Sequence, residues 1–127
     1  MRKVLFVDDE RDIRAVAGLA LGAVGRLEVE TVATGEEALT AARRGRPDVI
    51  LLDLVMPGID GAETFLALRA DEATKKIPVI FVTGKVQRTE IERLRKLGAL
   101  GVIEKPFDPM TLADQVRELV ERAGVRT

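Results

Sequence analysis

The 127-residue chain suits a single domain, residues 1–127, and its 46% hydrophobic content is enough for a core without disulfides. Acidic and basic side chains nearly cancel to a net charge of −1, which argues against direct nucleic-acid binding through a basic surface. The chain contains neither cysteine nor histidine, so thiolate metal sites and a histidine general base are excluded. The sequence has no signal peptide or membrane-spanning run, so we expect a cytoplasmic domain without a membrane partner.

The first half of the chain alternates apolar runs with amphipathic repeats. A continuous apolar run at 4–7 predicts a buried strand, and apolar residues at helical spacing from 13 to 24 predict a helix. A weaker apolar stretch at 29–33 predicts the second strand. The pair Thr34 and Glu37 has the spacing of a capping box and predicts the start of a second helix. The face of the first helix that we expect to be buried consists of Ile13, Val16, Ala17, Ala20 and Val24.

The second half repeats this alternation. Continuous apolar runs at 48–53 and 77–83 predict buried strands, and a shorter run at 100–104 predicts the last strand. Three further helices are indicated by residues typical of helix ends: Asp60 with Glu63 as a capping box, Gly98 as a C-terminal cap, and Asp108 as an N-cap before Pro109. Their expected buried side chains are Phe65, Leu66 and Leu68, then Ile91, Leu94 and Leu97, and finally Leu112, Val116 and Leu119.

Five strands alternating with five helices predict an α/β domain whose parallel sheet is covered by helices on both faces. Ligands of such sheets bind beyond the carboxyl ends of the strands. Polar residues follow four of the expected strands at this edge. They are Asp8, Asp9 and Glu10 after the first strand, Asp53 after the third, Thr83 after the fourth and Lys105 after the fifth.

This combination of side chains suits phosphoryl chemistry. Crowded carboxylates repel each other, and Mg²⁺, which prefers oxygen ligands, relieves that repulsion. An aspartate can attack phosphorus, while Mg²⁺, the ammonium of Lys105 and the hydroxyl of Thr83 would stabilise the transferred group. Each residue also has a structural explanation, because acids suit the start of a helix, Asp53 and Thr83 suit turns, and a lysine before proline is usually a solvated loop residue. Their joint occurrence at four strand ends favours one shared site.

The chain resembles the CheY-like receiver domain of two-component response regulators along essentially its whole length. Four segments carry the resemblance: VLFVDDE at 4–10, DVILLDLVMPGIDG at 48–61, IPVIFVTGK at 77–85 and LGALGVIEKPFDPMTL at 97–112. The resemblance implies a flavodoxin-like, doubly wound fold with strand order 2-1-3-4-5. It also implies a phosphoprotein of signal transduction that acts on no metabolite.

The resemblance further implies a role for individual residues. Asp53 is the expected phosphoacceptor, supplied by a sensor histidine kinase or a phosphotransfer protein. Asp9 is expected to bind Mg²⁺ directly with help from Asp8, and Asp53 and the backbone carbonyl of Val55 complete the metal ligands. Thr83 and Lys105 are expected to bind phosphoryl oxygens, and the Lys105–Pro106 peptide is expected to be cis. The switch should reach an unknown downstream protein partner, or an output domain, through the loop after Thr83 and the fourth helix.

Three positions bear on how this receiver would differ from the best-studied ones. Val102 stands where those receivers carry an aromatic that swings inward, so a valine cannot operate that switch. Val55 and Lys85 occupy the two positions that tune how long the phosphoryl group persists. Because Val55 has no polar group to align an attacking water, we expect a lifetime of minutes or longer, although the residue could equally serve only to pack the loop.

Two other functions fit the sequence less well than the receiver hypothesis does. A Mg²⁺ phosphohydrolase usually has a second acid two residues beyond its nucleophile, where this chain has Val55. A flavin-binding module shares the strand order, but its phosphate would be repelled by Asp8, Asp9 and Glu10, and the chain has no Trp or Tyr to stack on the ring. The sequence leaves open whether the receiver stands alone or belongs to a larger regulator.

Overall fold

The computed structural model describes residues 1–84 and 87–124. Strands and helices alternate as expected, and a short π-helical segment, η1, extends the first helix. The elements are β1 Lys3–Val7, α1 Arg11–Gly18, η1 Leu19–Val24, β2 Glu28–Val32, α2 Gly35–Gly45, β3 Val49–Leu52, α3 Gly61–Ala70, β4 Val79–Thr83, α4 Arg88–Lys96, β5 Gly101–Glu104 and α5 Leu112–Arg122. Among the described residues, no helix is long and apolar enough to cross a membrane.

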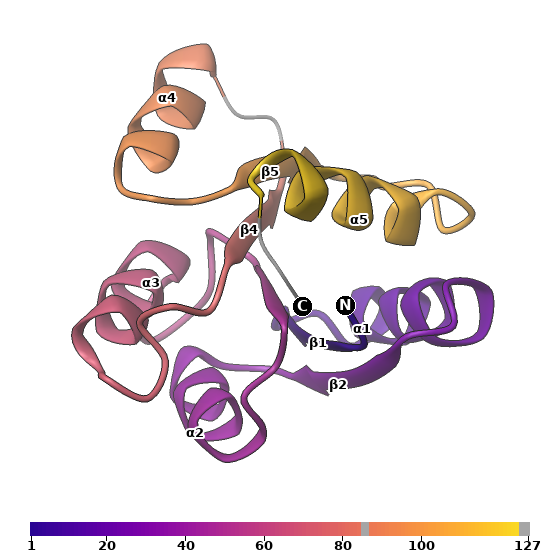
Figure 1. Cartoon of the computed structure of the whole chain (residues 1–127), viewed down its shortest axis with the longest axis horizontal. Helices are drawn as coiled ribbons and strands as arrows, with labels where there is room; N and C mark the ends of the chain where they lie inside the picture. The colour runs from indigo at the N-terminus through magenta and orange to yellow at the C-terminus, as the bar shows by residue number, and fades with distance from the viewer. Residues whose placement is uncertain (85–86, 125–127) are drawn as a thin grey trace.

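The five strands form one parallel sheet in the order β2-β1-β3-β4-β5, which confirms the expected flavodoxin-like arrangement. Figure 1 shows this sheet between two layers, with α1 and α5 on one side and α2, α3 and α4 on the other. Each layer covers its own apolar core because successive strand residues point to opposite faces. In β1, Val4 and Phe6 pack with α1, η1 and α5, whereas Leu5 and Val7 pack with α2, α3 and α4.

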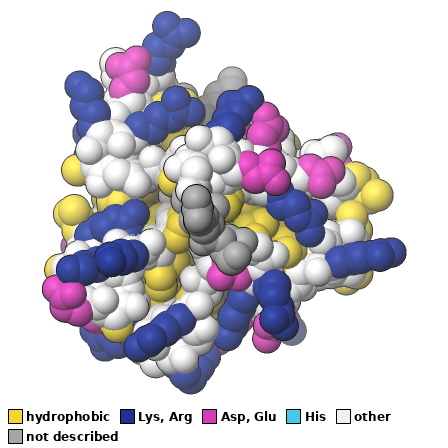
Figure 2. Space-filling model, viewed as in Figure 1, with side chains coloured by type: hydrophobic (Ala, Val, Ile, Leu, Met, Phe, Trp, Pro, Cys, Tyr) yellow, Lys and Arg dark blue, Asp and Glu magenta, His cyan; other side chains and the backbone are white. Residues whose placement is uncertain are grey.

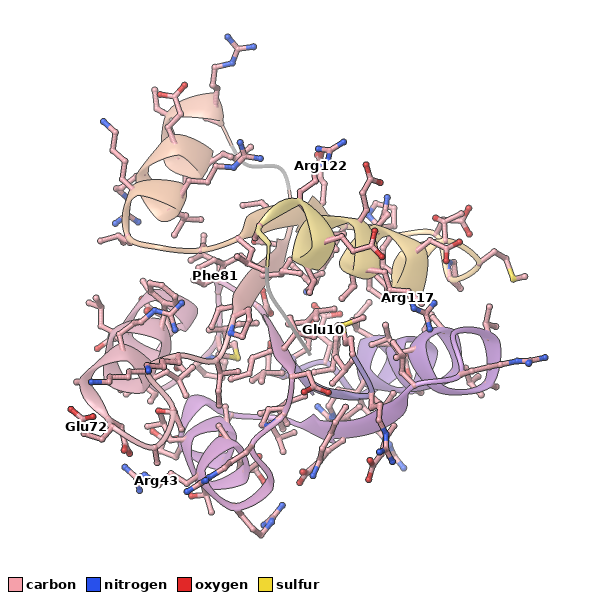
Figure 3. All side chains as sticks on the ribbon, in the orientation of Figure 1. Glu10, Arg43, Glu72, Phe81, Arg117 and Arg122 are labelled. Carbon is pink, nitrogen blue, oxygen red and sulfur yellow. The ribbon has the colours of Figure 1, made fainter. Side chains whose placement is uncertain are left out.

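Side chains from both layers tie the helices to the sheet. Phe81 of β4 lies on the α3 side of the sheet (Figure 3). Its ring centroid is 5.7 Å from that of Phe65 in α3. On the other side, Arg117 of α5 donates a 2.5 Å hydrogen bond to the carbonyl of Gly25, just beyond η1. These contacts hold the helices against the sheet and against each other, and they involve none of the site residues.

The buried face of the first helix differs from the expected one. Ala17 and Ala20 are buried as expected, but Val16 is 40% exposed and Val24 is 44% exposed. Val16 is rotated by about 100° from Ala17 around the helix axis, which turns it away from the sheet. Val24 lies in η1, where the wider π-helical turn shifts the spacing and buries Leu21 instead.

Two expected leucines of later helices are also exposed. Leu66 of α3 is 54% exposed, while Phe65 and Leu68 are buried. Leu97 is 41% exposed just beyond α4, whose buried residue is Leu94. Leu97 holds the C-cap position, and Gly98, the expected C-terminal cap, follows it with a positive φ of 112°. Apolar identity alone therefore did not identify which residues on these short helices face the core.

Helix starts follow the expected capping residues in α2 and α3 but not in α5. The Thr34 hydroxyl accepts a hydrogen bond from the Glu37 amide, and Asp60 forms a complete capping box with Glu63. Asp108 was expected to be the N-cap of the last helix, which is wrong, because its carboxylate accepts a hydrogen bond from the Met110 amide in a turn. The N-cap of α5 is Thr111, three residues later.

Candidate functional site

The carboxyl ends of neighbouring strands bring the candidate residues to one edge of the sheet. The last residues of β1 and β3, Val7 and Leu52, are paired in register. The Asp53 amide donates a 3.0 Å hydrogen bond to the carbonyl of Val7, which places Asp53 beside Asp8. This parallel pairing places two acids from distant parts of the chain next to each other.

Three aspartates form an acidic cluster at this edge. One carboxylate oxygen from each of Asp8, Asp9 and Asp53 lies within 4.8 Å of the others. Asp8 is fully buried and Asp53 is 5% exposed, whereas Asp9 is exposed to solvent. A cluster of oxygen donors that combines burial with one open side suits a hard divalent cation, so these residues could hold a metal ion.

Lys105 supplies the positive charge of the site. Its Nζ atom lies 2.5 Å from Oδ2 of Asp8 and 3.4 Å from Oδ2 of Asp53. Burial alone would lower the pKa of Lys105, but the hydrogen bond to Asp8 and the charge of Asp53 outweigh it and raise the pKa. The Lys105–Pro106 peptide is cis, as expected from the resemblance.

Asp53 is held in an environment that disfavours its charge. Burial raises its pKa, Lys105 lowers it, and the nearby Asp8 carboxylate raises it, with a net value of about 6. The Val55 amide donates a 3.3 Å hydrogen bond to Oδ1 of Asp53 and favours the carboxylate. The ammonium of Lys105 pairs with two of the three clustered carboxylates, so a bound cation would relieve the remaining repulsion.

Thr83 ends β4 and is buried at the same edge of the sheet. Its carbonyl accepts a 2.7 Å hydrogen bond from the Lys105 amide, so β4 delivers Thr83 next to the residue that follows β5. Its hydroxyl makes no side-chain hydrogen bond with other residues in the described part of the chain, 1–84 and 87–124. The backbone of Thr83 therefore lies next to that of Lys105.

The remaining expected positions are placed less directly. The Val55 side chain is 73% exposed beside Asp53, and the role of its carbonyl as a metal ligand remains a prediction. Val102 is partly buried and packs against the core on the α2, α3 and α4 side. Lys85 lies outside the described residues, as does the adjacent part of the loop that follows Thr83.

Gly61 is a site residue that the sequence patterns did not single out. A Cβ atom at this position would lie 2.2 Å from the carbonyl oxygen of Asp53 and 2.6 Å from the Cα atom of Leu54. The Gly61 amide also donates a 2.9 Å hydrogen bond to the Leu54 carbonyl. The start of α3 therefore packs directly on the backbone of Asp53, and the Asp-Gly pair at 60–61 was the signal that could have pointed to it.

Comparison with known proteins identifies the family of the chain. A family model described as "Response regulator receiver domain" matches residues 4–117. The chain belongs to the response regulator receiver domain family. Receiver domains are phosphoacceptor signalling domains, and the cluster of Asp8, Asp9 and Asp53 fits the phosphorylation site of the family. Receiver domains also bind metal at such an acidic pocket.

Individual relatives agree with this assignment. The DNA-binding response regulator MtrA of Mycobacterium tuberculosis H37Rv is 33% identical over 121 residues, which cover 95% of this chain and 51% of MtrA. The structure of the chemotaxis response regulator CheY4 of Vibrio cholerae is 37% identical with a TM-score of 0.85, covering 94% of this chain and 98% of CheY4. The N-terminal domain of a response regulator receiver protein from Methanoculleus marisnigri JR1 is 32% identical with a TM-score of 0.77. The match covers 100% of this chain and 99% of that domain. The receiver thus spans about half the length of MtrA.

Proposed function

We propose that this receiver accepts a phosphoryl group on Asp53 from a sensor histidine kinase or a phosphotransfer protein, and that the modification changes the binding of a downstream protein partner. The observation that carries the proposal is the position of the Asp53 carboxylate, which clusters with Asp8 and Asp9 and lies 3.4 Å from the ammonium of Lys105. A carboxylate so placed has a nucleophilic oxygen and, close by, a positive charge for the incoming group.

Each residue of the site has a distinct part in this proposal. Asp8, Asp9, Asp53 and the carbonyl of Val55 would hold Mg²⁺, which when bound neutralises the carboxylates and the oxygens of the phosphoryl group. An Asp53 oxygen forms the new bond to phosphorus as the bond to the donor breaks. Lys105 pairs with a phosphoryl oxygen, and the Thr83 hydroxyl donates a hydrogen bond to another.

The acceptor is tested by intact mass after incubation with Mg²⁺ and acetyl phosphate. The wild-type mass should rise by one phosphoryl group, and Asp53→Ala should abolish the rise. Asp114→Ala is the matched control, because its side chain is 80% exposed on α5 and its substitution should leave labelling unchanged. Equal labelling of wild type and Asp53→Ala would show that another residue accepts the group.

We also propose that the signal leaves the site through the loop after Thr83 and through α4. The described residues of α4 have one fully buried side chain, Leu94, so few core contacts resist a shift of this helix. Val102 has no ring that could rotate, which leaves the backbone after Thr83 as the route. Beryllofluoride with Mg²⁺ should therefore shift the NMR amide signals of α4 more than those of α2, and equal shifts would contradict this route.

No metabolite substrate is proposed for this chain. The position that carries a second acid in aspartyl-phosphate hydrolases is held by Val55, which cannot protonate a leaving group. We expect no turnover of a generic phosphate ester above the rate of Asp53→Ala. The DNA binding named for MtrA describes that longer protein, and with a net charge of −1 we propose no direct nucleic-acid contact for this receiver.

The distribution of surface charge supports the proposal of a downstream protein partner. On the face shown in Figure 2, Lys and Arg side chains are spread over the outer parts of the molecule, including α4 and α2, and acidic side chains lie among them. Mixed charge of this kind supports solubility and selective protein contacts.

A further inference from the structure

We propose that Arg14 is a positioning residue for the acidic cluster, because its guanidinium holds the main-chain carbonyl of Asp8 and fixes the turn that presents Asp8 and Asp9. This inference rests on the proposed phosphoacceptor function and extends it to a residue outside the cluster. Arg14 touches neither the phosphoryl group nor the cation, and it acts through the backbone of Asp8.

The contact is direct. Nη1 of Arg14 donates a 2.9 Å hydrogen bond to the carbonyl oxygen of Asp8. Arg14 lies in α1 one turn after Glu10, whose carbonyl accepts a 3.0 Å hydrogen bond from the Arg14 amide. The half-buried side chain therefore reaches back along the helix to the strand end, in the direction that helical side chains favour.

The choice of hydrogen-bond partner separates this arginine from an ordinary ion-pairing residue. Three carboxylates lie at the same edge of the sheet, yet within the described residues Arg14 forms no ion pair with any of them. Its Nη1 atom instead donates to a neutral carbonyl. Arg14 therefore occupies no carboxylate oxygen of the cluster, while its positive charge remains near the cluster.

Asp8 is held on both sides of its Cα atom. Its amide donates a 3.1 Å hydrogen bond to the Val32 carbonyl, and its carbonyl accepts the bond from Arg14. Its side chain accepts a 2.9 Å hydrogen bond from the Glu10 amide. Asp9 is solvent-exposed, and the carbonyl that Arg14 binds belongs to the peptide that joins Asp8 to Asp9. Loss of the guanidinium would free this peptide to rotate and would carry the Asp9 carboxylate away from Asp8 and Asp53.

Isothermal titration calorimetry with Mg²⁺ in 0.15 M salt tests the inference on the full chain. Partners that orient metal ligands are worth about 10–100-fold in affinity, so Arg14→Met should raise the Kd for Mg²⁺ about tenfold. Arg14→Lys keeps the charge and a donor and should recover part of the loss. Arg11→Met is the matched control, since Arg11 is an exposed arginine of the same helix, and it should change the Kd less than twofold.

A purely structural role or a diffuse charge effect would give different results. A lower Tm of Arg14→Met with an unchanged Kd would overturn the inference, because the arginine would then support only the fold. Equal weakening by Arg14→Met and Arg11→Met would also overturn it, since both variants remove the same charge. Binding by wild type and no difference in any variant would refute the inference while leaving the proposed function intact. Absence of Mg²⁺ and beryllofluoride binding by wild type would refute both.

Hydrogen exchange gives a second measurement that does not need the cation. In Mg²⁺-free protein, the Glu10 amide is protected by its hydrogen bond to Asp8. Arg14→Met should accelerate exchange of this amide, measured by NMR, relative to the Leu5 amide within β1. Unchanged relative exchange would show that the turn keeps its order without Arg14 and would overturn the inference even if overall stability falls.

Discussion

The ammonium of Lys105 donates a 2.5 Å hydrogen bond to a carboxylate oxygen of Asp8, although 97 positions separate the two residues in the chain. The Asp8 side chain is fully buried and that of Lys105 is 17% exposed. The same ammonium lies 3.4 Å from Asp53. Lys105 therefore balances part of the charge of two buried acids and connects the ends of β1, β3 and β5.

Lys105→Met should destabilise the protein at neutral pH. Removal of one partner from a fully buried ion pair costs about 3–5 kcal/mol, and we expect about 2 kcal/mol here because Lys105 retains some exposure. The Asp53 pKa should also rise above about 6, since Lys105 lowers it. Urea unfolding followed by circular dichroism measures the free-energy change.

The exposed Lys76 provides a matched substitution for this measurement. Lys76→Met should change the free energy of unfolding by less than about 0.5 kcal/mol. The proposed binding of Mg²⁺ to the folded state predicts that saturating Mg²⁺ stabilises both Lys105→Met and wild type. An equal unfolding free energy for Lys105→Met and Lys76→Met would mean that the ammonium contributes little to the fold.

The raised pKa of Asp53 predicts a pH dependence of stability with a defined sign. Without Mg²⁺, between about pH 4 and about pH 6, the folded protein keeps a proton on Asp53 that the unfolded chain has released. The contribution of Asp53 to stability therefore falls as the pH rises through this window and is constant above it. Asp53→Asn, which is always neutral, should raise the Tm at pH 7 more than at pH 4.

Asp48 gives the opposite sign in the same experiment. Burial alone would raise its pKa, but hydrogen bonds from the Arg2 and Lys3 amides, at 2.8 and 2.9 Å, outweigh burial and lower the pKa. Its stabilising contribution is therefore present at pH 7 and is lost as the pH falls through the lowered pKa. Asp48→Asn should lower the Tm at pH 7, and a rise of Tm there would be incompatible with these contacts.

Gly61→Ala should disturb both stability and the site. The added Cβ would meet backbone atoms of Asp53 and Leu54, which cannot rotate away as a side chain could. Overpacking of this kind costs about 1–3 kcal/mol, and the forced shift would move the Asp53 carboxylate relative to Asp8. We expect a lower Tm together with weaker Mg²⁺ binding by calorimetry.

Gly18→Ala is the matched glycine substitution. Gly18 lies in α1, and a Cβ built there meets no atom within 4 Å. Since alanine favours a helix over glycine, this variant should gain about 0.5–1 kcal/mol and bind Mg²⁺ as wild type does. Unchanged Tm and Mg²⁺ affinity in Gly61→Ala would show that α3 can move away from Asp53 at no cost.

Val55 should set a long phosphoryl lifetime. Its apolar side chain is 73% exposed beside Asp53 and cannot orient a water molecule for attack. We expect the phosphorylated form to last for minutes or longer in Mg²⁺ buffer, measured by intact mass after removal of acetyl phosphate. Val55→Asn should shorten this lifetime, because a carboxamide can hold a water near the phosphoryl group.

Leu66→Asn controls for the general effect of a polar surface substitution. Leu66 is 54% exposed on α3 and should not alter the lifetime when replaced. Loss of the phosphoryl group within seconds from wild type would contradict the expected role of Val55, whatever the variants do.

The strands and their shared edge could be predicted from the sequence, whereas the helix ends could be predicted only in part. Continuous apolar runs such as 4–7 and 77–83 predicted strands buried on both faces, and the burial of β1 and β4 fits a parallel sheet between helices. Once the sheet is parallel, residues that follow its strands share one edge, so the proximity of Asp8 and Asp53 could be anticipated. Helix ends were less certain: Thr34 caps α2 as its pattern indicated, whereas Asp108 forms a turn and α5 begins only after Thr111, whose side chain makes no capping hydrogen bond.

The sequence by itself thus determined the element order, the sheet class and the set of polar residues at the carboxyl edge, because these depend on periodicity and on short-range preferences. Only the tertiary structure decided that Lys105 bonds Asp8, that burial lifts the pKa of Asp53 and that Gly61 leaves no room for a side chain. Those features depend on distances between atoms far apart in the chain and on the exclusion of water. Neither quantity is encoded in a local pattern of residues.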